Sequence, residues 1–186
     1  MSGPLDRERL VKLFDELSAE LRFSRTRAQI YIVGGAAMSL AFDRERTTRD
    51  VDARIDAGHP RLVEAVRKVG RRHGLGDTWL NDEATTATPR AADGRAETVY
   101  QSRHLTVTGA SAKHLLAMKL LAARGKDRED IAVLCKHLGL KRPEEALRIY
   151  RDLFPDEKIK NRAREFLDLA FRWRTPGHER DAGPSR

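Results

Sequence analysis

The 186-residue chain has a single cysteine, which excludes an intramolecular disulfide and a cysteine-based zinc site. Cys135 lies in the apolar segment IAVLCKHL, where we expect a small core residue. Long apolar runs are also lacking, and no segment approaches the roughly 20 apolar residues of a membrane span. The charged first ten residues contain no apolar region typical of a signal peptide. We therefore expect a cytoplasmic protein with no membrane partner.

Acidic residues are the minority among the charged ones. The chain has 36 Lys and Arg against 28 Asp and Glu, a formal net charge of +8. This balance predicts an anionic partner such as nucleic acid, nucleotide or an acidic protein. A merely soluble basic protein would also fit, so charge alone does not decide. The aromatic residues Trp79 and Trp173 are expected in the core rather than as platforms for base stacking.

The N-terminal part, to about residue 110, mixes helix and strand patterns. Apolar residues at three- and four-residue spacing indicate helices, and alternation of apolar and charged residues indicates half-exposed strands. We expect helices at residues 5–22, 36–42 and 59–73, strands at 29–33 and 50–56, a short strand within 77–82, and a hairpin of strands at 96–101 and 104–109.

After Gly109 the pattern is helical. Ser111 is a candidate N-cap for the first of these helices. We expect helices at residues 112–124, 128–138, 143–154 and 156–173. The polar, Pro- and Gly-rich tail 175–186 is expected to be disordered. The sequence thus predicts an α+β fold with a small mixed sheet in residues 1–110 and a helical part in 111–174.

Gly34 and Gly35 lie where the expected strand passes into a helix. Glycine permits a positive φ and lets the backbone approach a ligand closely. The start of a helix offers unpaired N–H groups and a positive dipole end to phosphate. A plain strand-to-helix turn would also place glycines here, so the Gly-Gly pair by itself is weak evidence for a phosphate site.

Asp50 and Asp52 lie two positions apart, on one side of the expected strand. Two carboxylates so close repel each other unless a cation neutralises them, and Mg²⁺ or Mn²⁺ shared with substrate phosphates would do so. The alternative is a solvated strand face that pairs with neighbouring arginines. Taken alone, the pair is also weak evidence.

The combination of the two motifs is far more specific. A strand, Gly-Gly, a helix and an Asp-x-Asp strand resemble the polymerase-β-like nucleotidyltransferase superfamily at about this spacing. The basic lead-in RERTTRD is similar to that of nucleotidyltransferase toxins of the AbiEii and MenT type and of the small DUF6036-type proteins. TWLND at 78–82 is in keeping with the DUF6036-type group. The resemblance runs from about Gln29 to Leu138.

The helical part carries a second resemblance. KHLLAMKLLAARGKDREDI is similar to the toxin element in which a lysine-bearing helix runs into Arg-x-x-Asp-x-x-Asp. The matching residues are Lys119, Arg124, Asp127 and Asp130. Lys119 and Lys126 would share one helix face if the helix continued through Gly125. Without the resemblance, Lys119 would be taken as solvated, and Lys126 and Asp130 as an i,i+4 ion pair.

Ten residues are candidates for the site. The resemblance implies that Asp50 and Asp52 hold the metal ions and that Lys119 and Asp130 join them as catalytic residues. The candidates for binding the nucleotide are Gly34, Gly35, Ser39, Arg46, Thr48 and Arg49. Thr48 is included for its position alone, because it shares the face of Asp50 if the strand already begins there. Ser39 has the alternative of a solvated helix residue, and the two arginines that of surface ion pairs, which contribute only ~0–1 kcal/mol.

The chain departs from the superfamily pattern in two places. A third carboxylate is usual on a later strand, but HLTVTG has none, so Asp82, Glu97 or Asp130 would have to supply it. A lysine is usual on a strand before the toxin helix, and the nearest basic residue here is Arg103.

The implied activity is transfer of NMP from an NTP such as ATP or CTP to RNA. The resemblance points to the tRNA 3′ end as acceptor and to a cognate antitoxin as partner. One alternative is an antibiotic nucleotidyltransferase, although such enzymes usually need an acidic cleft for a cationic drug. Another is a non-catalytic nucleotide- or RNA-binding module. A basic C-terminal stripe could position tRNA or be a solvated face; it comprises Lys158, Lys160, Arg162, Arg164, Arg172 and Arg174.

Overall fold

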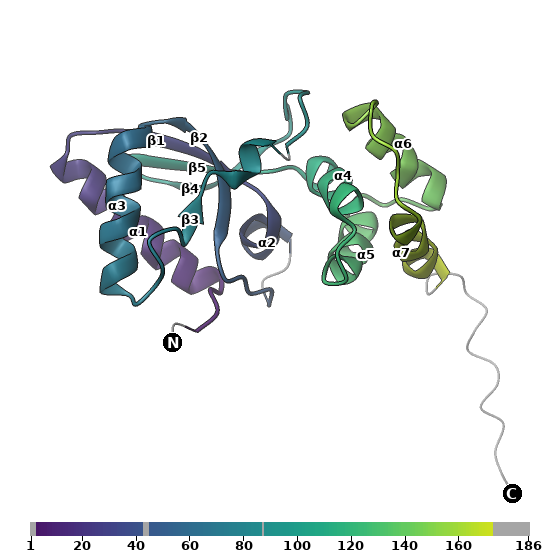
Figure 1. The fold of residues 1–186 in the computed structure, drawn as a ribbon, viewed down its shortest axis with the longest axis horizontal. Coiled ribbons are helices and arrows are strands. Elements are labelled where there is room, and N and C mark those ends of the chain that lie inside the picture. Colours follow the sequence, from purple (N-terminus) through teal and green to yellow (C-terminus); the bar gives the residue numbers. More distant parts are fainter. Residues whose placement is uncertain (1–2, 43–44, 87, 173–186) are drawn as a thin grey trace, which may run out of the picture. The chain divides into compact units, whose positions relative to one another are not determined.

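The computed structural model describes residues 3–42, 45–86 and 88–172 of two compact units, Met1–Leu115 and Leu116–Arg186. Figure 1 draws the first unit in purple to teal and the second in green to yellow. The first unit contains a mixed five-stranded sheet with helices, and the second is helical in its described residues. The predicted α+β class is therefore confirmed. The tail 175–186 and Trp173 lie outside the described residues.

The sheet has the strand order β3-β2-β1-β5-β4. Strand β1 is central; it pairs antiparallel with β2 and parallel with β5, which pairs antiparallel with β4. The short strand β3 extends β2 in parallel. The expected hairpin is confirmed as β4 and β5. The bounds are β1 Ala28–Ile32, β2 Val51–Ala57, β3 Leu80–Asn81, β4 Glu97–Gln101 and β5 Leu105–Gly109.

Helices α1 (Arg7–Phe23) and α3 (His59–Arg72) cover the sheet of the first unit (Figure 1). Asp6 caps α1, because its carboxylate accepts a hydrogen bond from the backbone N–H of Arg9. The apolar face of α1 is fully buried, as its three- and four-residue spacing predicts; it consists of Leu10, Leu13, Phe14, Leu17 and Leu21. Trp79 is also in the core, as expected, and is 3% exposed.

The segment between β1 and β2 differs from the expected helix at residues 36–42. Helix α2 (Gly34–Ala37) already contains both glycines, and the π-helical turn η1 (Met38–Phe42) follows it. Strand β2 begins only at Val51, so Asp50 lies in a bend just before it. A short 3₁₀ turn, η2 (Glu83–Thr86), follows β3.

The second unit is formed by the last four helices, of which α4 begins in the first unit and continues into the second. Their bounds are α4 Ala112–Ala122, α5 Asp127–His137, α6 Pro143–Leu153 and α7 Asn161–Arg172. Ser111 Oγ accepts the backbone N–H of His114 at 3.4 Å and so caps α4, as predicted. Cys135 is fully buried, which confirms it as a core residue.

The bounds of two of these helices differ from the expected ones. Helix α4 ends at Ala122 rather than at residue 124, and Ala123 has a positive φ of 48°, so the helix does not continue through Gly125. Lys119 and Lys126 therefore share no helix face. The last helix begins at Asn161 rather than at residue 156, and residues 156–160 are not helical.

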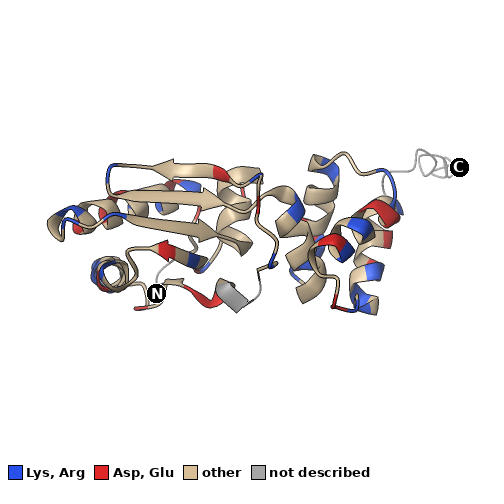
Figure 2. Ribbon diagram, turned by 90° about the horizontal axis from the view of Figure 1, so that it is seen from above, with Lys and Arg blue, Asp and Glu red and all other residues tan. Residues whose placement is uncertain are grey.

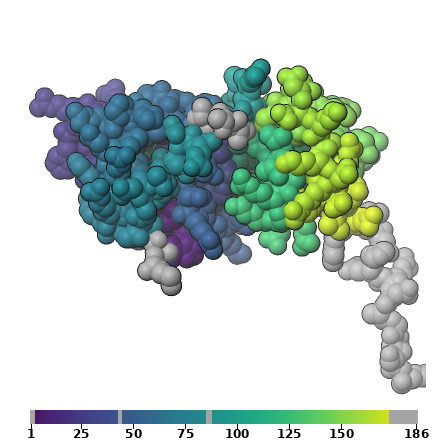
Figure 3. All heavy atoms as spheres, in the orientation of Figure 1, coloured from purple at the N-terminus to yellow at the C-terminus, as the bar shows by residue number. Residues whose placement is uncertain are grey.

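The basic residues of the predicted C-terminal stripe are exposed as far as the structure describes them, and Arg174 lies outside that range. Figure 2 marks acidic residues in red among the basic residues in blue along the ribbon of these helices. The exposed acids of α7 include Glu165 and Asp168. The surface of the second unit, green to yellow in Figure 3, therefore carries both signs of charge rather than a purely basic stripe.

Among the described residues, no helix has both the length and the apolar character that crossing a membrane requires.

Candidate functional site

Gly34 brings the backbone of the first α2 turn against the carboxylate of Asp52. Gly34 has a φ of 61°, in the left-handed region that favours glycine. A Cβ added to Gly34 would stand 3.1 Å from Asp52 Oδ2. The backbone N–H of Val33 also donates to the carbonyl of Asp52 at 2.9 Å, because β1 and β2 are neighbours. The structure thus places one predicted metal ligand beside one predicted phosphate-binding residue.

The backbone of Gly35 lies even closer to Thr48 than that of Gly34 lies to Asp52. A Cβ on Gly35 would lie 2.6 Å from Thr48 Oγ1 and 2.9 Å from Thr48 Cβ, so no side chain fits there. Thr48 pairs with Leu5 in an isolated antiparallel bridge, and its hydroxyl donates to the carbonyl of Asp50 at 3.0 Å. The bridge to Leu5 and the hydroxyl hydrogen bond hold Thr48 beside the glycine pair, although it lies outside strand β2.

Asp50 and Asp52 differ in their surroundings. Asp50 is exposed in the bend before β2, whereas Asp52 is half-buried within the strand. Asp52 Oδ1 accepts a hydrogen bond from Asn81 Nδ2 at 3.3 Å. Neither carboxylate forms an ion pair with a residue in the described part of the chain, so the interpretation as a solvated face pairing with arginines does not hold for them.

A divalent cation fits these two carboxylates only with help from other ligands. Hard cations such as Mg²⁺ prefer oxygen ligands and are commonly held by one or two carboxylates together with substrate phosphates. Among the described residues, no group of three or more His, Cys, Asp or Glu could enclose a metal ion by itself. The donor set of Asp50 and Asp52 therefore suits a cation that arrives with a triphosphate better than a resident structural metal.

The remaining predicted nucleotide-binding residues follow the same turn in the sequence. Ser39 lies in η1 and is completely buried, so its interpretation as a solvated residue is wrong. Its hydroxyl has no hydrogen-bond partner among the described residues. Arg46 is half-buried and Arg49 is exposed. Their contacts with a nucleotide stay a prediction.

Asn81 occupies the position where the sheet could have offered a third carboxylate. Asp52 and Asn81 are register partners on β2 and β3, and their side chains are hydrogen-bonded. Of the predicted alternatives, Asp82 follows Asn81 directly but lies 3.3 Å from His59 Nε2, and Glu97 begins β4 at the far edge of the sheet. In the sequence, the string TWLND indicates a short strand at most, and no role for Asn81 follows from it.

Lys119, Asp127 and Asp130 form a buried ion cluster in the second unit. Lys119 Nζ lies 2.8 Å from Asp127 Oδ1 and 2.6 Å from Asp130 Oδ2. Asp127 Oδ2 accepts the backbone N–H of Arg124 at 2.9 Å. The solvated interpretation of Lys119 and the Lys126–Asp130 pair are both replaced by this cluster, since Lys119 is only 8% exposed. The catalytic role of Lys119 and Asp130 stays a prediction.

A second buried polar cluster, centred on Asp93, was not predicted. Asp93 Oδ2 accepts hydrogen bonds from the Tyr31 hydroxyl and the Ser111 backbone N–H, both at 2.8 Å, and Asp93 Oδ1 lies 3.3 Å from His114 Nδ1. Burial is the main reason why the pKa of Tyr31 is raised, and the hydrogen bond to Asp93 raises it further. Burial alone would raise the pKa of Asp93, but the hydrogen bonds from Ser111 and Tyr31 outweigh it and lower that pKa.

The Asp93 cluster resembles a Ser-His-Asp triad only in composition. Ser111 Oγ and the Asp93 carboxylate both face the same ring atom, His114 Nδ1, each at 3.3 Å. A triad needs the serine on one ring nitrogen and the acid on the other. Instead, His114 Nε2 lies 3.3 Å from the carbonyl of Ala91. The cluster therefore fixes the loop before β4 to the start of α4 rather than activating a nucleophile.

Comparison with known proteins finds a matching protein family and a solved structure that is similar to this chain. The antigenic nucleotidyltransferase-like protein from Paracoccidioides brasiliensis is similar over 91% of this chain and 95% of its own, with 15% identity and a TM-score of 0.40. No curated protein matches the chain significantly. A family model described as nucleotidyltransferase of unknown function (DUF6036) matches residues 8–175, nearly the whole chain. The protein therefore belongs to the DUF6036 family of nucleotidyltransferases.

Proposed function

We propose that this protein transfers NMP from an NTP to a hydroxyl group of RNA and releases pyrophosphate. The observation that carries the proposal is the contact between Gly34 and Asp52, because it joins a phosphate-binding type of turn to a metal-binding type of carboxylate. The family supports transferase chemistry, since it consists of nucleotidyltransferases. The position of Thr48 against Gly35 gives the same site a hydroxyl.

In this proposal, Asp50 and Asp52 hold Mg²⁺ or Mn²⁺, which would neutralise the triphosphate and activate the acceptor hydroxyl. The backbone N–H groups at Gly34 and Gly35 bind phosphate oxygens, because α2 begins there and its first N–H groups lack helical partners. Arg46 and Arg49 provide positive charge for the triphosphate, which a guanidinium binds with two parallel hydrogen bonds. These residues bind and orient the nucleotide.

The proposed acceptor is RNA, most specifically the 3′ end of tRNA. The net charge of +8 supports a polyanionic acceptor and disfavours a cationic drug. Three finer parts of the proposal rest on the resemblance of the segment from Lys119 to Asp130 to AbiEii- and MenT-type toxins. They are the tRNA 3′ end as acceptor, a toxin role that blocks translation, and a cognate antitoxin as partner. The buried cluster of Lys119, Asp127 and Asp130 would then support the second unit or the acceptor side of the reaction.

Labelled NTPs test the proposal directly. The protein is incubated with Mg²⁺, total RNA and each NTP labelled at the α-phosphate, and the RNA is separated on a gel. We expect label on RNA in the tRNA size range with wild type and none with Asp52→Asn. If no RNA becomes labelled, or if Asp52→Asn transfers label as wild type does, the proposal is contradicted. An aminoglycoside added in place of RNA shows whether an antibiotic is the acceptor.

A non-catalytic nucleotide-binding protein is the second candidate, and Asn81 favours it. An amide beside Asp52 replaces the acid that a third carboxylate would supply. This candidate predicts that the protein binds NTP without transferring label to any acceptor. It also predicts that Asn81→Asp changes NTP binding but creates no transfer.

A further inference from the structure

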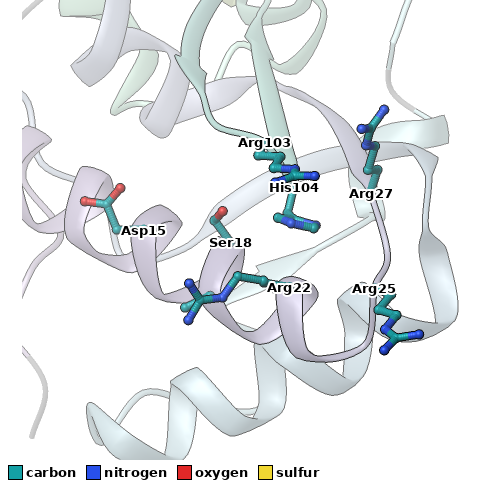
Figure 4. A pocket seen from close by; sticks show the side chains of 8 residues that line it. Asp15, Ser18, Arg22, Arg25, Arg27, Arg103 and His104 are labelled. Carbon is teal, nitrogen blue, oxygen red and sulfur yellow. The ribbon is translucent and has the colours of Figure 1, made fainter.

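A basic cavity lies in the first unit at the opposite end of β1 from the glycine pair. It has a volume of about 760 Å³. It is lined by three segments, and its lining residues are Asp15, Ser18, Ala19, Arg22, Arg25, Arg27, Arg103 and His104. Figure 4 shows these segments around the cavity: α1, the stretch that leads from α1 into β1, and the turn between β4 and β5. Strand β1 begins after Arg27 and ends just before Gly34. The two sites therefore lie at opposite ends of β1, ~20 Å apart along the strand.

Local sequence explains why these side chains meet. Asp15, Ser18, Ala19 and Arg22 have the i, i+3, i+4, i+7 spacing of one helix face. Strands β1 and β5 are parallel, so the residues that precede them, Arg27 and His104, reach the same edge of the sheet. His104 Nδ1 lies 3.0 Å from the carbonyl of Thr26, which can only accept, so this nitrogen carries a proton.

The arginines around the cavity are not neutralised by ion pairs with other described residues of the protein. Its four arginines are exposed, and none forms an ion pair with any described residue. Asp15 is the single acid among the lining residues, and its Oδ1 already accepts a hydrogen bond from the Tyr100 hydroxyl at 2.7 Å. The macrodipole at the end of α1 favours Arg22 but does not extend to Arg27 or Arg103. Like charges around one hollow repel each other unless an anion binds between them.

An exposed aromatic side chain lies next to one of the arginines that line the cavity. Phe23 is 76% exposed, and the guanidinium of Arg22 lies over its ring at 5.6 Å from the centroid. Arginines that follow a phosphate backbone, together with an aromatic ring on which a base can stack, are the groups that bind single-stranded nucleic acid. A free phosphate or an acidic peptide would use the arginines but would have no need of the ring.

We infer that this cavity binds the phosphodiester backbone of single-stranded RNA, with the exposed Phe23, beside Arg22, stacking on a base. The choice of RNA as ligand rests on the proposed function, in which RNA is the acceptor. The cavity then holds a part of the acceptor away from the hydroxyl that reacts, because it lies at the other edge of the sheet from Asp52. Arg22, Arg27 and Arg103 contact phosphates, and Ser18 and His104 provide further polar contacts.

Fluorescence anisotropy with a short, labelled, unstructured oligoribonucleotide tests the inference over a range of NaCl concentrations. The test variant combines Arg22→Ala, Arg27→Ala and Arg103→Ala. The control combines Arg61→Ala, Arg67→Ala and Arg95→Ala, which removes the same charge from exposed arginines outside the cavity. We expect the cavity variant to bind at least tenfold more weakly at low salt, and the slope of log K against log salt to fall by about 2, from ~0.7 for each lost phosphate contact.

Two further variants keep the result interpretable. Replacing the same three arginines by lysine retains the charge and should retain most of the salt slope, which separates lost charge from lost folding. Phe23→Ala should weaken binding about fivefold or more without changing the salt slope, since stacking is not ionic. Leu169→Ala is the matched control, because Leu169 is the other large apolar side chain found exposed in the described residues.

Three results would overturn the inference: no salt-dependent RNA binding by wild type, equal losses in the cavity and control variants, or displacement of RNA by polyglutamate as effectively as by unlabelled RNA. The proposed function is judged separately by label transfer. If RNA binds through the cavity but no label is transferred, the proposed function fails and the inference stands. If label is transferred and the cavity variant binds RNA as wild type does, the inference alone fails.

Discussion

The carboxylate of Asp52 lies against the backbone of Gly34, with Oδ2 3.1 Å from the position that a Cβ of residue 34 would take. The contact joins two residues 18 positions apart because β1 and β2 are adjacent antiparallel strands. Gly34 is thus constrained twice, by its φ of 61° and by its neighbour. This relationship gives the proposed nucleotide site its geometry.

Gly34→Ala should weaken nucleotide binding more than it weakens folding. The left-handed φ makes alanine unfavourable by about 1 kcal/mol. The added methyl group would also displace the Asp52 carboxylate, and we expect at least tenfold weaker NTP binding, equivalent to about 1.4 kcal/mol. Calorimetric titration with Mg²⁺–NTP and urea unfolding measure the two effects.

Gly74→Ala is the matched control for this change. Gly74 has a φ of 63°, and no atom lies within 4 Å of the position that its Cβ would take. It should lose only the stability that the left-handed φ costs, and it should bind NTP as wild type does. Equal NTP binding by the two variants would show that the contact with Asp52 has no part in the site.

Gly35→Ala should destabilise the protein through a clash with Thr48. Contacts of 2.6 and 2.9 Å cannot be accommodated without movement, and overpacking of this kind costs about 1–3 kcal/mol. Adding Thr48→Gly removes both contacting atoms and should restore most of the lost free energy of unfolding. Gly76→Ala, which meets no atom within 4 Å, serves as control. No rescue by Thr48→Gly would contradict the steric explanation.

Lys119→Met should be strongly destabilising, because it leaves Asp127 and Asp130 buried without their shared cation. Removing one partner of a buried ion pair costs about 3–5 kcal/mol. Lys113→Met, on the exposed side of the same helix, should change the free energy of unfolding by less than about 0.5 kcal/mol. Urea denaturation followed by circular dichroism measures both. A loss for Lys119→Met as small as that of the control would argue against the buried cluster.

Acid should destabilise the protein through Asp93. Hydrogen bonds from Ser111 and Tyr31 lower its pKa below the ordinary 3.8 despite burial, so the unfolded chain binds the proton more readily than the folded one. The stabilisation is complete above the ordinary value and is lost as pH falls through the lowered folded pKa. Asp93→Asn should therefore show a shallower fall of unfolding free energy with acid, and Tyr31→Phe an intermediate one. An unchanged acid slope in Asp93→Asn would contradict this.

Local patterns in the sequence predict the elements around the site well. The apolar run that ends before Gly34 and the alternation after Asp50 indicate β1 and β2 without knowledge of the fold, because the run reflects a strand buried on both faces and the alternation a strand buried on one. The cap at Ser111 likewise depends only on residues within one turn. The antiparallel pairing of β1 and β2 brings Gly34 and Asp52 together. The spacing of the two motifs predicts this proximity only through the family resemblance.

Contacts between distant segments account for what the sequence did not predict. The sequence predicts a short strand within residues 77–82, but not its pairing with β2, which is what places Asn81 of β3 beside Asp52. Asp93 meets Tyr31 across 62 positions, and no periodicity signals such a pair. The helix break at Ala123 depends on a positive φ at a residue that normally favours helix, and it lets Asp127 and Asp130 turn back to Lys119.

Calorimetric titration of NTP in the presence and absence of Mg²⁺ tests the central claim most directly, using wild type and the double variant Asp50→Asn with Asp52→Asn. If these two carboxylates and the glycine turn hold a metal-bound triphosphate, wild type binds ATP or CTP with Mg²⁺, and binding is lost with a chelator or in the double variant. Equal binding by both proteins, or binding by wild type that is indifferent to Mg²⁺, would contradict the account.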